Sequence, residues 1–541
     1  MGGHRFRTVA ACAVALSVAT WALGCDAVPK VPPAALAAGP GLGPATLVVA
    51  RPADTAGLDP AEATVLEAVE IIEHVTERLV RVRPGAQEVE PMLATSWTST
   101  PDGLEWTFHL RPGTRFQDGT PVDAAAVVFS IERQRDPFHP AYEPRFTALR
   151  AAMPYVERVE ALDPLTVRIT LDRPHAPFLA ALATSPMSVV SPTAVKKWGA
   201  AFGVHLVGSG PFRLASMIPG DRVVLERWDG YAGEPPRLER LVFRTVPDAR
   251  ARLVALESGN VDVAYAIPPE ERQFVELHPD LTLHRLAGLN VAYVAMNTAR
   301  PPLDDRRLRI AINQAVSRDA IVKLVFQGAA QPALGPVPPS LWGHVDALAA
   351  TPYDPSGAKV AIAALKADGT LAPGRRLTLY VPIQARAYLP DPARVGRAIQ
   401  QHLADAGLDV DLVLQDFGKH LDSVHRGEHD LCLLGWTGSM SDPDNFLYPL
   451  LDRDNAEPPY ARNVAFFRDA ELHGILTYAR EASDPKERAA HYARAQEIVA
   501  REAPWVPLAH ADVTVATRRT VRGLEVYPTS HVGYDRAWLE R

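Results

Sequence analysis

One stretch, residues 432–446, combines an aromatic side chain, small residues and acids in a pattern suited to holding a small molecule. Its apolar run is typical of a strand and stops at Gly435. The pairs Asp442-Pro443 and Asp444-Asn445 further on favour a turn. An aromatic ring beside a glycine-rich turn at the end of a strand often floors a ligand cleft, although packing in a core is the more frequent role of a Trp. Trp436 is the residue of this stretch that could line such a cleft.

A second loop supplies a cation. Residues 384–390 follow a predicted strand at 377–382 and contain Arg386 and Tyr388. The guanidinium fork of an Arg suits a carboxylate and the Tyr ring adds an apolar wall, although Arg386 could equally be a solvated loop residue. Strands and helices alternate from this loop to Trp436, which implies parallel pairing with ligands beyond the carboxyl ends of the strands. We therefore expect both loops at one edge of a sheet.

Other chemistries find little support. His425 and His429 are four residues apart, but Gly427 breaks the helix between them and no third ligand is evident, so we expect no metal site and no cofactor. The Gly-Ser-Gly at residues 208–210 lacks the spacing of a phosphate loop or a nucleophile elbow. Without a visible nucleophile–base pair we expect a binding protein rather than an enzyme. A net charge of −7 with no Lys/Arg-rich stripe argues against nucleic acid.

The N-terminal residues predict export. Residues 1–24 combine two Arg with a nearly uncharged apolar run, which is typical of a secretory signal peptide. A retained membrane anchor is the alternative, but the run is short for a hydrocarbon core about 30 Å thick. The residues before Cys25 resemble a lipobox, although the Leu sits one place later than usual. We therefore expect a lipid on Cys25 and a Pro/Gly/Ala-rich tether over residues 25–45, with the folded part in the periplasm or otherwise outside the cytoplasm.

The rest of the chain alternates strand and helix patterns, so its 541 residues predict an α/β protein of two or three domains. One helix is expected to begin at Asp59, with an apolar stripe that reaches Leu79. Other expected elements are strands at 46–50 and 104–110, helices capped by Asp123, Asp248 and Ser317, a hairpin at 212–225, and helices at about 392–406 and 485–502. Cys432, in an apolar strand, is expected to be a buried small side chain.

Two blocks of this sequence resemble one protein family. Residues 435–446 read Gly-Trp-x-Gly-x-x-x-Asp-Pro-Asp-Asn-Phe, and residues 108–133 run from Phe-His-Leu-Arg-Pro-Gly through Gln-Asp-Gly-Thr-Pro-Val-Asp into a capped helix. Both are similar to the peptide/nickel-type extracytoplasmic solute-binding proteins (bacterial solute-binding protein family 5), which are the receptors of peptide-type ABC importers. The resemblance extends from about residue 46 to about residue 530.

The resemblance implies a two-lobed α/β Venus flytrap of the periplasmic-binding-protein type, class II or cluster C, with an extra N-terminal subdomain. Lobe I would comprise residues 46–293, including the extra subdomain at about 76–200, and lobe II residues 294–508. Residues 509–541 would return to lobe I, and two strands would cross the hinge. Ligand would bind between the lobes and shift the population towards a closed state.

The resemblance also implies roles for the two loops. In dipeptide-binding relatives a Trp-Thr-Gly-Asp turn supplies a carboxylate for the ammonium of the peptide, and an Arg on the facing loop takes the terminal carboxylate. Trp436, Thr437 and Gly438 match that turn and Arg386 matches the Arg, but Ser439 replaces the acid. The resemblance thus implies a ligand at Trp436, Thr437, Gly438, Ser439 and Asp442, as well as at Arg386 and Tyr388. A neutral hydroxyl cannot compensate a buried ammonium, and Asp442 is either a substitute or a turn residue before Pro443. We therefore expect a carboxylate-bearing ligand, or a peptide whose amino end is blocked or placed differently; broad peptide binding through backbone hydrogen bonds also stays open.

The partners implied by the resemblance are a peptide or other small solute, the transmembrane subunits of an ABC permease, and the membrane through the lipid anchor, with the protein itself a monomer. Because a fold does not define its ligand, other readings stay open. They are a receptor for a nickel complex, haem or a sugar conjugate, and a sensory surface lipoprotein that serves no transporter.

Overall fold

The computed structural model describes residues 45–540, apart from residues 56, 63–64, 84–87, 147–148 and 150–152. The predicted signal peptide, Cys25 and all but the last residue of the predicted tether lie outside these residues. None of the described helices is long and apolar enough to cross a membrane.

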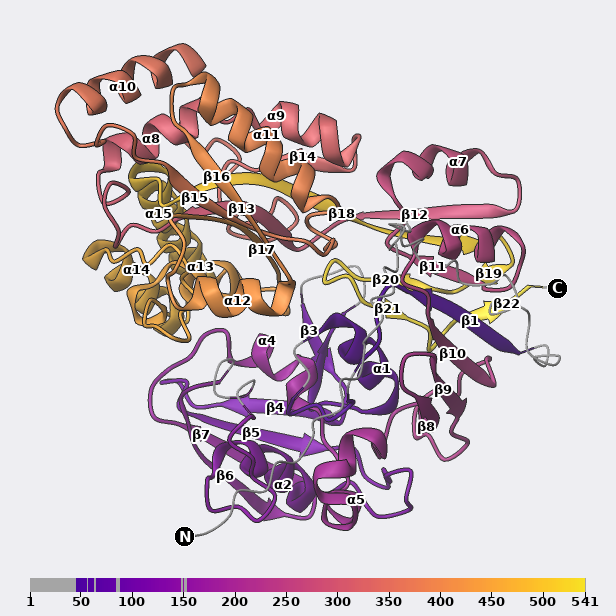
Figure 1. The fold of residues 1–541 in the computed structure, drawn as a ribbon. Helices are drawn as coiled ribbons and strands as arrows, with labels where there is room; N and C mark the ends of the chain where they lie inside the picture. The colour runs from indigo at the N-terminus through magenta and orange to yellow at the C-terminus, as the bar shows by residue number, and fades with distance from the viewer. Residues whose placement is uncertain are drawn as a thin grey trace, which may run out of the picture. The chain divides into compact units, whose positions relative to one another are not determined.

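One twelve-stranded mixed sheet runs through the protein (Figure 1). Its strands are β1 (Thr46–Arg51), β8 (Phe212–Ile218), β9 (Arg222–Arg227), β10 (Arg240–Thr245), β11 (Val263–Tyr265), β12 (Leu281–Ala287), β13 (Asn290–Met296), β14 (Ala330–Pro332), β15 (Leu377–Pro382), β16 (Val410–Gln415), β17 (Leu431–Thr437) and β18 (Trp505–Arg518). Ten of them follow one another in the order β16-β15-β17-β13-β18-β11-β1-β10-β9-β8, while β12 and β14 pair with β18. The strands expected at 46–50 and 377–382 and the hairpin expected at 212–225 are confirmed.

Two stretches of chain cross between the halves of this sheet. β18 pairs with β12 through residues 512–518 and with β13 through residues 505–509. β12 and β13 follow each other directly along the chain. We call the half with β1 and β8–β12 lobe I and the half with β13–β17 lobe II. Each half has hydrophobic cores of its own, so the protein has the expected two-lobed α/β fold.

Lobe I contains two cores. In the first, α1 (Leu66–Val75) and α5 (Pro192–Trp198) pack on the main sheet. The second core lies between a separate antiparallel sheet, with the strand order β4-β5-β7-β6, and the helices that pack on it. Its elements are β4 (Ala94–Ser99), β5 (Glu105–Leu110), β6 (Val156–Asp163), β7 (Thr166–Leu171), α2 (Ala124–Arg135) and α4 (Phe178–Leu182). α2 begins as predicted, because the Asp123 carboxylate accepts a hydrogen bond from the Ala126 N–H at 2.9 Å.

The first helix differs from its prediction. α1 spans only Leu66–Val75, whereas we expected a helix from Asp59 with a stripe that reaches Leu79. Asp59 instead forms a buried ion pair with Arg133 of α2 and accepts a hydrogen bond from the Ala61 N–H at 3.0 Å. Because the Asp59 carboxylate binds Arg133 and the Ala61 N–H, it stabilises a turn at this point, and α1 begins only at Leu66.

Lobe I is completed by short elements and by the C-terminal end of the chain. The short elements are β2 (Val80–Val82), β3 (Val89–Pro91), α6 (Ala249–Glu257) and α7 (Arg272–Leu277). The C-terminal strands are β19 (Val521–Arg522), β20 (Glu525–Val526), β21 (Val532–Gly533) and β22 (Trp538–Leu539). Val532 and Tyr534 join the same core as Leu47 of β1, so the end of the chain packs into lobe I.

Helices cover both faces of the lobe II sheet. They are α8 (Arg306–Ala315), α9 (Arg318–Ile321), α10 (Pro355–Ala367), α11 (Pro392–Asp405), α12 (Phe417–His425), α13 (Asp444–Leu451), α14 (Ala470–Glu481) and α15 (Pro485–Glu502). Leu431 and Leu433 pack with α8, α10 and α11, whereas Cys432 and Leu434 pack with α13, α14 and α15. β15 pairs in parallel with β16 and β17, which confirms the expected parallel pairing.

Candidate ligand-binding site

Trp436 lies at the end of β17, and the loop after it is held by one side chain from α13. The Asn445 side-chain oxygen accepts hydrogen bonds from Trp436 Nε1 at 3.2 Å and from the Ser439 N–H at 3.0 Å. Trp436 is half-buried and Ser439 is exposed. The loop therefore presents an aromatic ring and a hydroxyl in a defined arrangement.

Two glycines allow this loop to pack closely. The Gly438 N–H donates to Leu289 O at 2.7 Å, and a Cβ on Gly438 would lie 2.8 Å from the Phe446 ring. A Cβ on Gly435 would lie 2.3 Å from the Tyr388 ring. Real Cβ contacts at these distances do not occur, so both positions require the absence of a side chain.

Tyr388 contacts the Trp436 loop through Gly435 and is almost entirely buried, with 8% of its surface exposed. Burial raises the pKa of its hydroxyl to about 12, so the side chain stays neutral. Tyr388 is thus a packing support between the two loops, and its ring offers a ligand little free surface.

Arg386 is held in a tight turn at the end of β15. Its backbone exchanges hydrogen bonds with Leu389 at 2.9 Å in both directions. Its guanidinium carbon lies 3.6 Å from the centre of the Phe417 ring, a stacked arrangement typical of Arg. The side chain is half-buried, and its Nε is buried with no hydrogen-bond partner among the described residues.

The two predicted loops lie at one edge of the sheet. β15 and β17 are parallel neighbours, so the loops that leave their carboxyl ends are adjacent. The contact between Tyr388 and Gly435 joins them directly. The structure therefore brings together Arg386, Tyr388 and Trp436.

Asp442, which we expected at a ligand, has another role. It is 4% exposed, and both of its oxygens accept hydrogen bonds from Arg488 Nη2 of α15 at 2.9 Å. Burial raises the pKa of the Asp442 carboxyl, and the Arg488 charge opposes that rise. Because the carboxylate is enclosed and paired within lobe II, it does not offer a free charge to a solute.

Asp444 is also buried and paired with an Arg of lobe II. Its carboxylate lies 3.1 Å from Arg480 Nε of α14, and burial raises its pKa to about 6. Arg480 also reaches lobe I, since its Nη1 donates to the Tyr155 hydroxyl at 3.0 Å and its carbonyl accepts from the Ala176 N–H at 2.6 Å. The loop side chain Met440 packs in the same lobe I core as Phe178. Contacts between the lobes therefore flank the Trp436 loop.

Three residues that organise this site are absent from the sequence prediction as functional positions. They are Asn445, Arg480 and Arg488. Asn445 lies within the Asp-Pro-Asp-Asn-Phe motif, so the motif could have been used to predict a role for Asn445 in this loop. The two Arg residues lie 36 and 46 positions from their acids, in a helical pattern that marks them only as surface charges.

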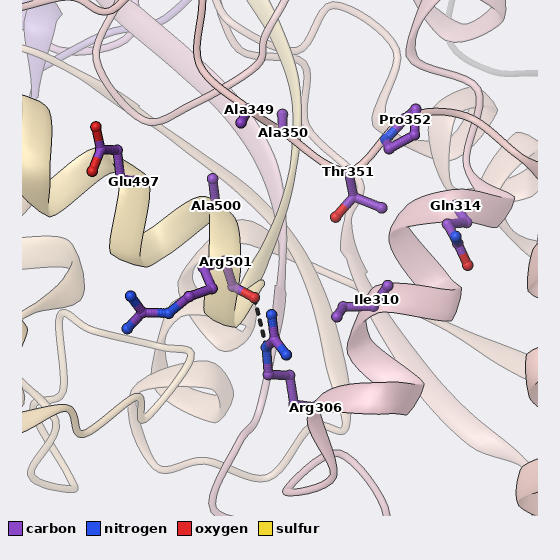
Figure 2. Close-up of a pocket in the computed structure, with 10 residues that line it drawn as sticks. All are labelled: Arg306, Ile310, Gln314, Ala349, Ala350, Thr351, Pro352, Glu497, Ala500 and Arg501. Atoms are coloured by element: carbon purple, nitrogen blue, oxygen red, sulfur yellow. Dashed lines mark hydrogen bonds between the residues drawn. The ribbon is translucent and has the colours of Figure 1, made fainter.

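Two other features lie apart from these loops. Asp452, Asp454 and His473 could together hold a metal ion, but His473 Nδ1 already lies within hydrogen-bond distance of Asp452, at 3.0 Å from Oδ2. A hollow of about 470 Å³ lies between α8, α15 and residues 349–352, and Figure 2 shows the side chains that line it. None of the predicted ligand-binding residues lines it.

Comparison with known proteins places most of the chain in one protein family. The family model of the bacterial extracellular solute-binding proteins, family 5 Middle, matches residues 88–458. The chain is 34% identical over 480 residues to heme-binding protein A of Haemophilus influenzae, covering 86% of each chain. It is 35% identical over 508 residues to di/tripeptide-binding protein 4 of Pseudomonas aeruginosa, covering 90% of this chain and 93% of the other.

Among solved structures, the fold matches the periplasmic binding protein DppA of Helicobacter pylori in complex with the peptide STSA. The TM-score is 0.82 at 31% identity, over 92% of this chain and 98% of the other. The family match and these relatives together cover almost all of the described residues. The chain therefore belongs to family 5 of the bacterial extracellular solute-binding proteins.

Proposed function

We propose that this protein is the receptor of an ABC importer, and that it binds peptides or peptide-like solutes that carry a carboxylate between its two lobes. A di/tripeptide-binding relative and a peptide-bound structural neighbour support the peptide class. In this proposal residues 46–293 with 509–541 form one body, residues 294–508 form the other, and closure delivers the solute to a membrane permease.

The carboxylate on the solute is inferred from Arg386, whose guanidinium has no acidic partner in the described part of the chain. Its guanidinium lies against Phe417, which orients the fork. A buried Nε without an acceptor is costly, and a carboxylate would accept from it and from a terminal nitrogen together. We therefore assign the solute carboxylate to Arg386.

The amino end of the solute meets no acid in the Trp436 loop. Ser439 is exposed but neutral, and the carboxylates of Asp442 and Asp444 are buried against Arg488 and Arg480. An ammonium left unpaired in a closed site costs several kcal/mol. The proposed solute therefore has a blocked amino end, or places that end elsewhere. The proposed walls of the solute site are still Trp436, Thr437, Gly438 and Ser439, and Tyr388 supports them. Asp442 is no longer proposed to contact the solute.

The first test is mass spectrometry of the solute released by denaturing protein purified from its own host. Short peptides or N-blocked acids support the proposal, whereas a ligand without a carboxylate contradicts it. Titration calorimetry then compares Arg386→Gln with Arg397→Gln, an exposed Arg on α11. Only Arg386→Gln should weaken binding, by at least about tenfold for a lost charge-assisted pair. Equal affinity of the two variants would exclude Arg386 from the site.

We further propose that the mature protein is a monomer held at the membrane by a lipid on Cys25. The lipobox-like sequence before Cys25 supports this. Metabolic labelling with palmitate should mark the wild type and not Cys25→Ser. Labelling of both proteins would show that the lipid is attached to a residue other than Cys25.

A further inference from the structure

Four segments meet at the start of β13. Leu289 O accepts from the Gly438 N–H at 2.7 Å, and the Leu289 N–H donates to Pro528 O of the C-terminal segment at 2.8 Å. The Asn290 side chain pairs with both backbone groups of Ala511 on β18 at 2.8 Å. The Trp436 loop, the lobe I tail and both crossing strands therefore converge on residues 289–290.

His510 of β18 lies at this junction with one ring nitrogen unused. Its Nδ1 lies 2.7 Å from Asn290 O, and because a carbonyl only accepts, Nδ1 must carry the proton. Nε2 is then a bare acceptor. It is buried with no hydrogen-bond partner in the described part of the chain, and the residue is 5% exposed. Burial lowers the pKa of His510 to about 4, so the ring is neutral.

His510 and Trp436 lie on the same face of the lobe II sheet. Ala509 and Ala511 both pack in the core on the face of Leu433, so His510 between them points to the opposite face. That opposite face carries Trp436 and its neighbours in the other core. β13 separates the strands of His510 and Trp436, which puts their backbones roughly 10 Å apart at ~4.8 Å per strand.

A second unpaired group lies beside the same junction. Ser530 follows Pro528 by two residues, in a turn closed by the Ser530 N–H and Tyr527 O at 2.9 Å. Its φ of +72° is unusual for a residue with a side chain, and its Oγ is buried without a partner among the described residues. Strained residues of this kind gather at functional sites.

We propose that His510 Nε2 accepts a hydrogen bond from the amide N–H at the acylated amino end of the bound solute, which is an N-acylated amino acid or short peptide with its carboxylate on Arg386. This inference rests on the proposed function. A neutral imidazole matches an amide N–H, and it supplies no charge for an ammonium. The strand order β15-β17-β13-β18 puts the backbones of β15 and β18 roughly 14 Å apart, and the Arg and His side chains extend from these backbones, so a short solute of at most about four extended residues can bridge them.

The test uses two probes, N-acetyl-alanyl-alanine and free alanyl-alanine, and titration calorimetry on the full mature chain. Wild type should prefer the acetylated probe by at least about tenfold, and His510→Leu should lose about tenfold for that probe. His510→Gln retains an acceptor and should bind it nearly as well as wild type. His284→Leu on the neighbouring β12, whose ring bonds Thr517, is the matched control and should bind normally. Circular dichroism verifies that each variant is folded.

The outcomes separate this inference from the proposed function. If Arg386→Gln abolishes binding while His510→Leu binds as wild type does, the carboxylate site stands and the His510 assignment is overturned. If wild type prefers the free dipeptide, the assignment of an N-acylated solute to His510 is overturned. If wild type binds neither probe and the native solute lacks a carboxylate, both fail.

Discussion

Replacement of Asp442 by Asn should unfold lobe II more easily and leave solute affinity unchanged. Asn keeps the shape of the side chain but removes the charge that Arg488 Nη2 contacts at 2.9 Å on both oxygens. Arg488 is 7% exposed, so it would remain as a buried cation whose acceptors are all neutral: Ala479 O, the Tyr492 hydroxyl and the new amide oxygen.

The magnitude follows from this burial. Breaking a buried ion pair by removing one partner costs about 3–5 kcal/mol. For a cooperative unit of roughly 200 residues, each kcal/mol lowers Tm by about 2–4 °C, so Asp442→Asn should lower Tm by roughly 10 °C. Asp442→Asn with Arg488→Met should cost clearly less than the sum of the two single changes, because the double variant leaves no unpaired buried charge.

Differential scanning calorimetry measures the Tm, and titration calorimetry at 10 °C measures affinity while each variant is folded. Arg397→Gln serves as the surface control. The opposite pattern, an unchanged Tm with tenfold weaker solute binding, would show that Asp442 contacts the solute and would refute its assignment as the internal partner of Arg488.

Three further predictions follow from single contacts. Gly435→Ala places a Cβ 2.3 Å from the Tyr388 ring, so it should destabilise lobe II by about 1–3 kcal/mol and weaken solute binding. Chemical unfolding measures the stability and titration calorimetry the affinity. A variant as stable as wild type would contradict the close contact between Gly435 and Tyr388. Ser439→Asp restores a carboxylate at an exposed loop position and should increase affinity for free alanyl-alanine, whereas no gain would exclude the ammonium from this loop. Burial raises the pKa of Glu70 from 4.5 to about 7, so the folded protein binds a proton that the unfolded chain has released between these pH values. Stability should therefore fall by about 3 kcal/mol as pH rises from 4.5 to 7, and Glu70→Gln should remove that slope; an equal slope in both proteins contradicts it.

Local patterns were enough to predict many elements and both loops. The helices at 392–405 and 485–502 and the strand at 377–382 lie where periodicity placed them, because burial of one face imposes its period on the sequence. The Trp436 loop and the Arg386 loop were predicted at one sheet edge from the alternation of strands and helices, and parallel pairing of β15 and β17 confirms it.

The same patterns failed where a side chain finds a partner far along the chain. Asp59 was expected to start a helix, but it pairs with Arg133, 74 residues away. Asp442 was expected at a ligand, but it pairs with Arg488, 46 residues away. An acid before a turn looks the same in a sequence whether it faces a solute or a buried cation, since its local geometry does not depend on its partner.

By itself the sequence determined the family, the two-lobed α/β fold and the two loops that Arg386 and Trp436 mark, because these depend on short-range periodicity and on specific motifs. Only the tertiary structure decided which polar groups are already paired. It paired Asp442 with Arg488, gave Tyr388 a supporting role, and left Arg386 and His510 among the described residues that have a buried nitrogen without a hydrogen-bond partner. The physical reason is that hydrogen-bond satisfaction depends on residues brought together by folding, which the order of residues along the chain does not reveal.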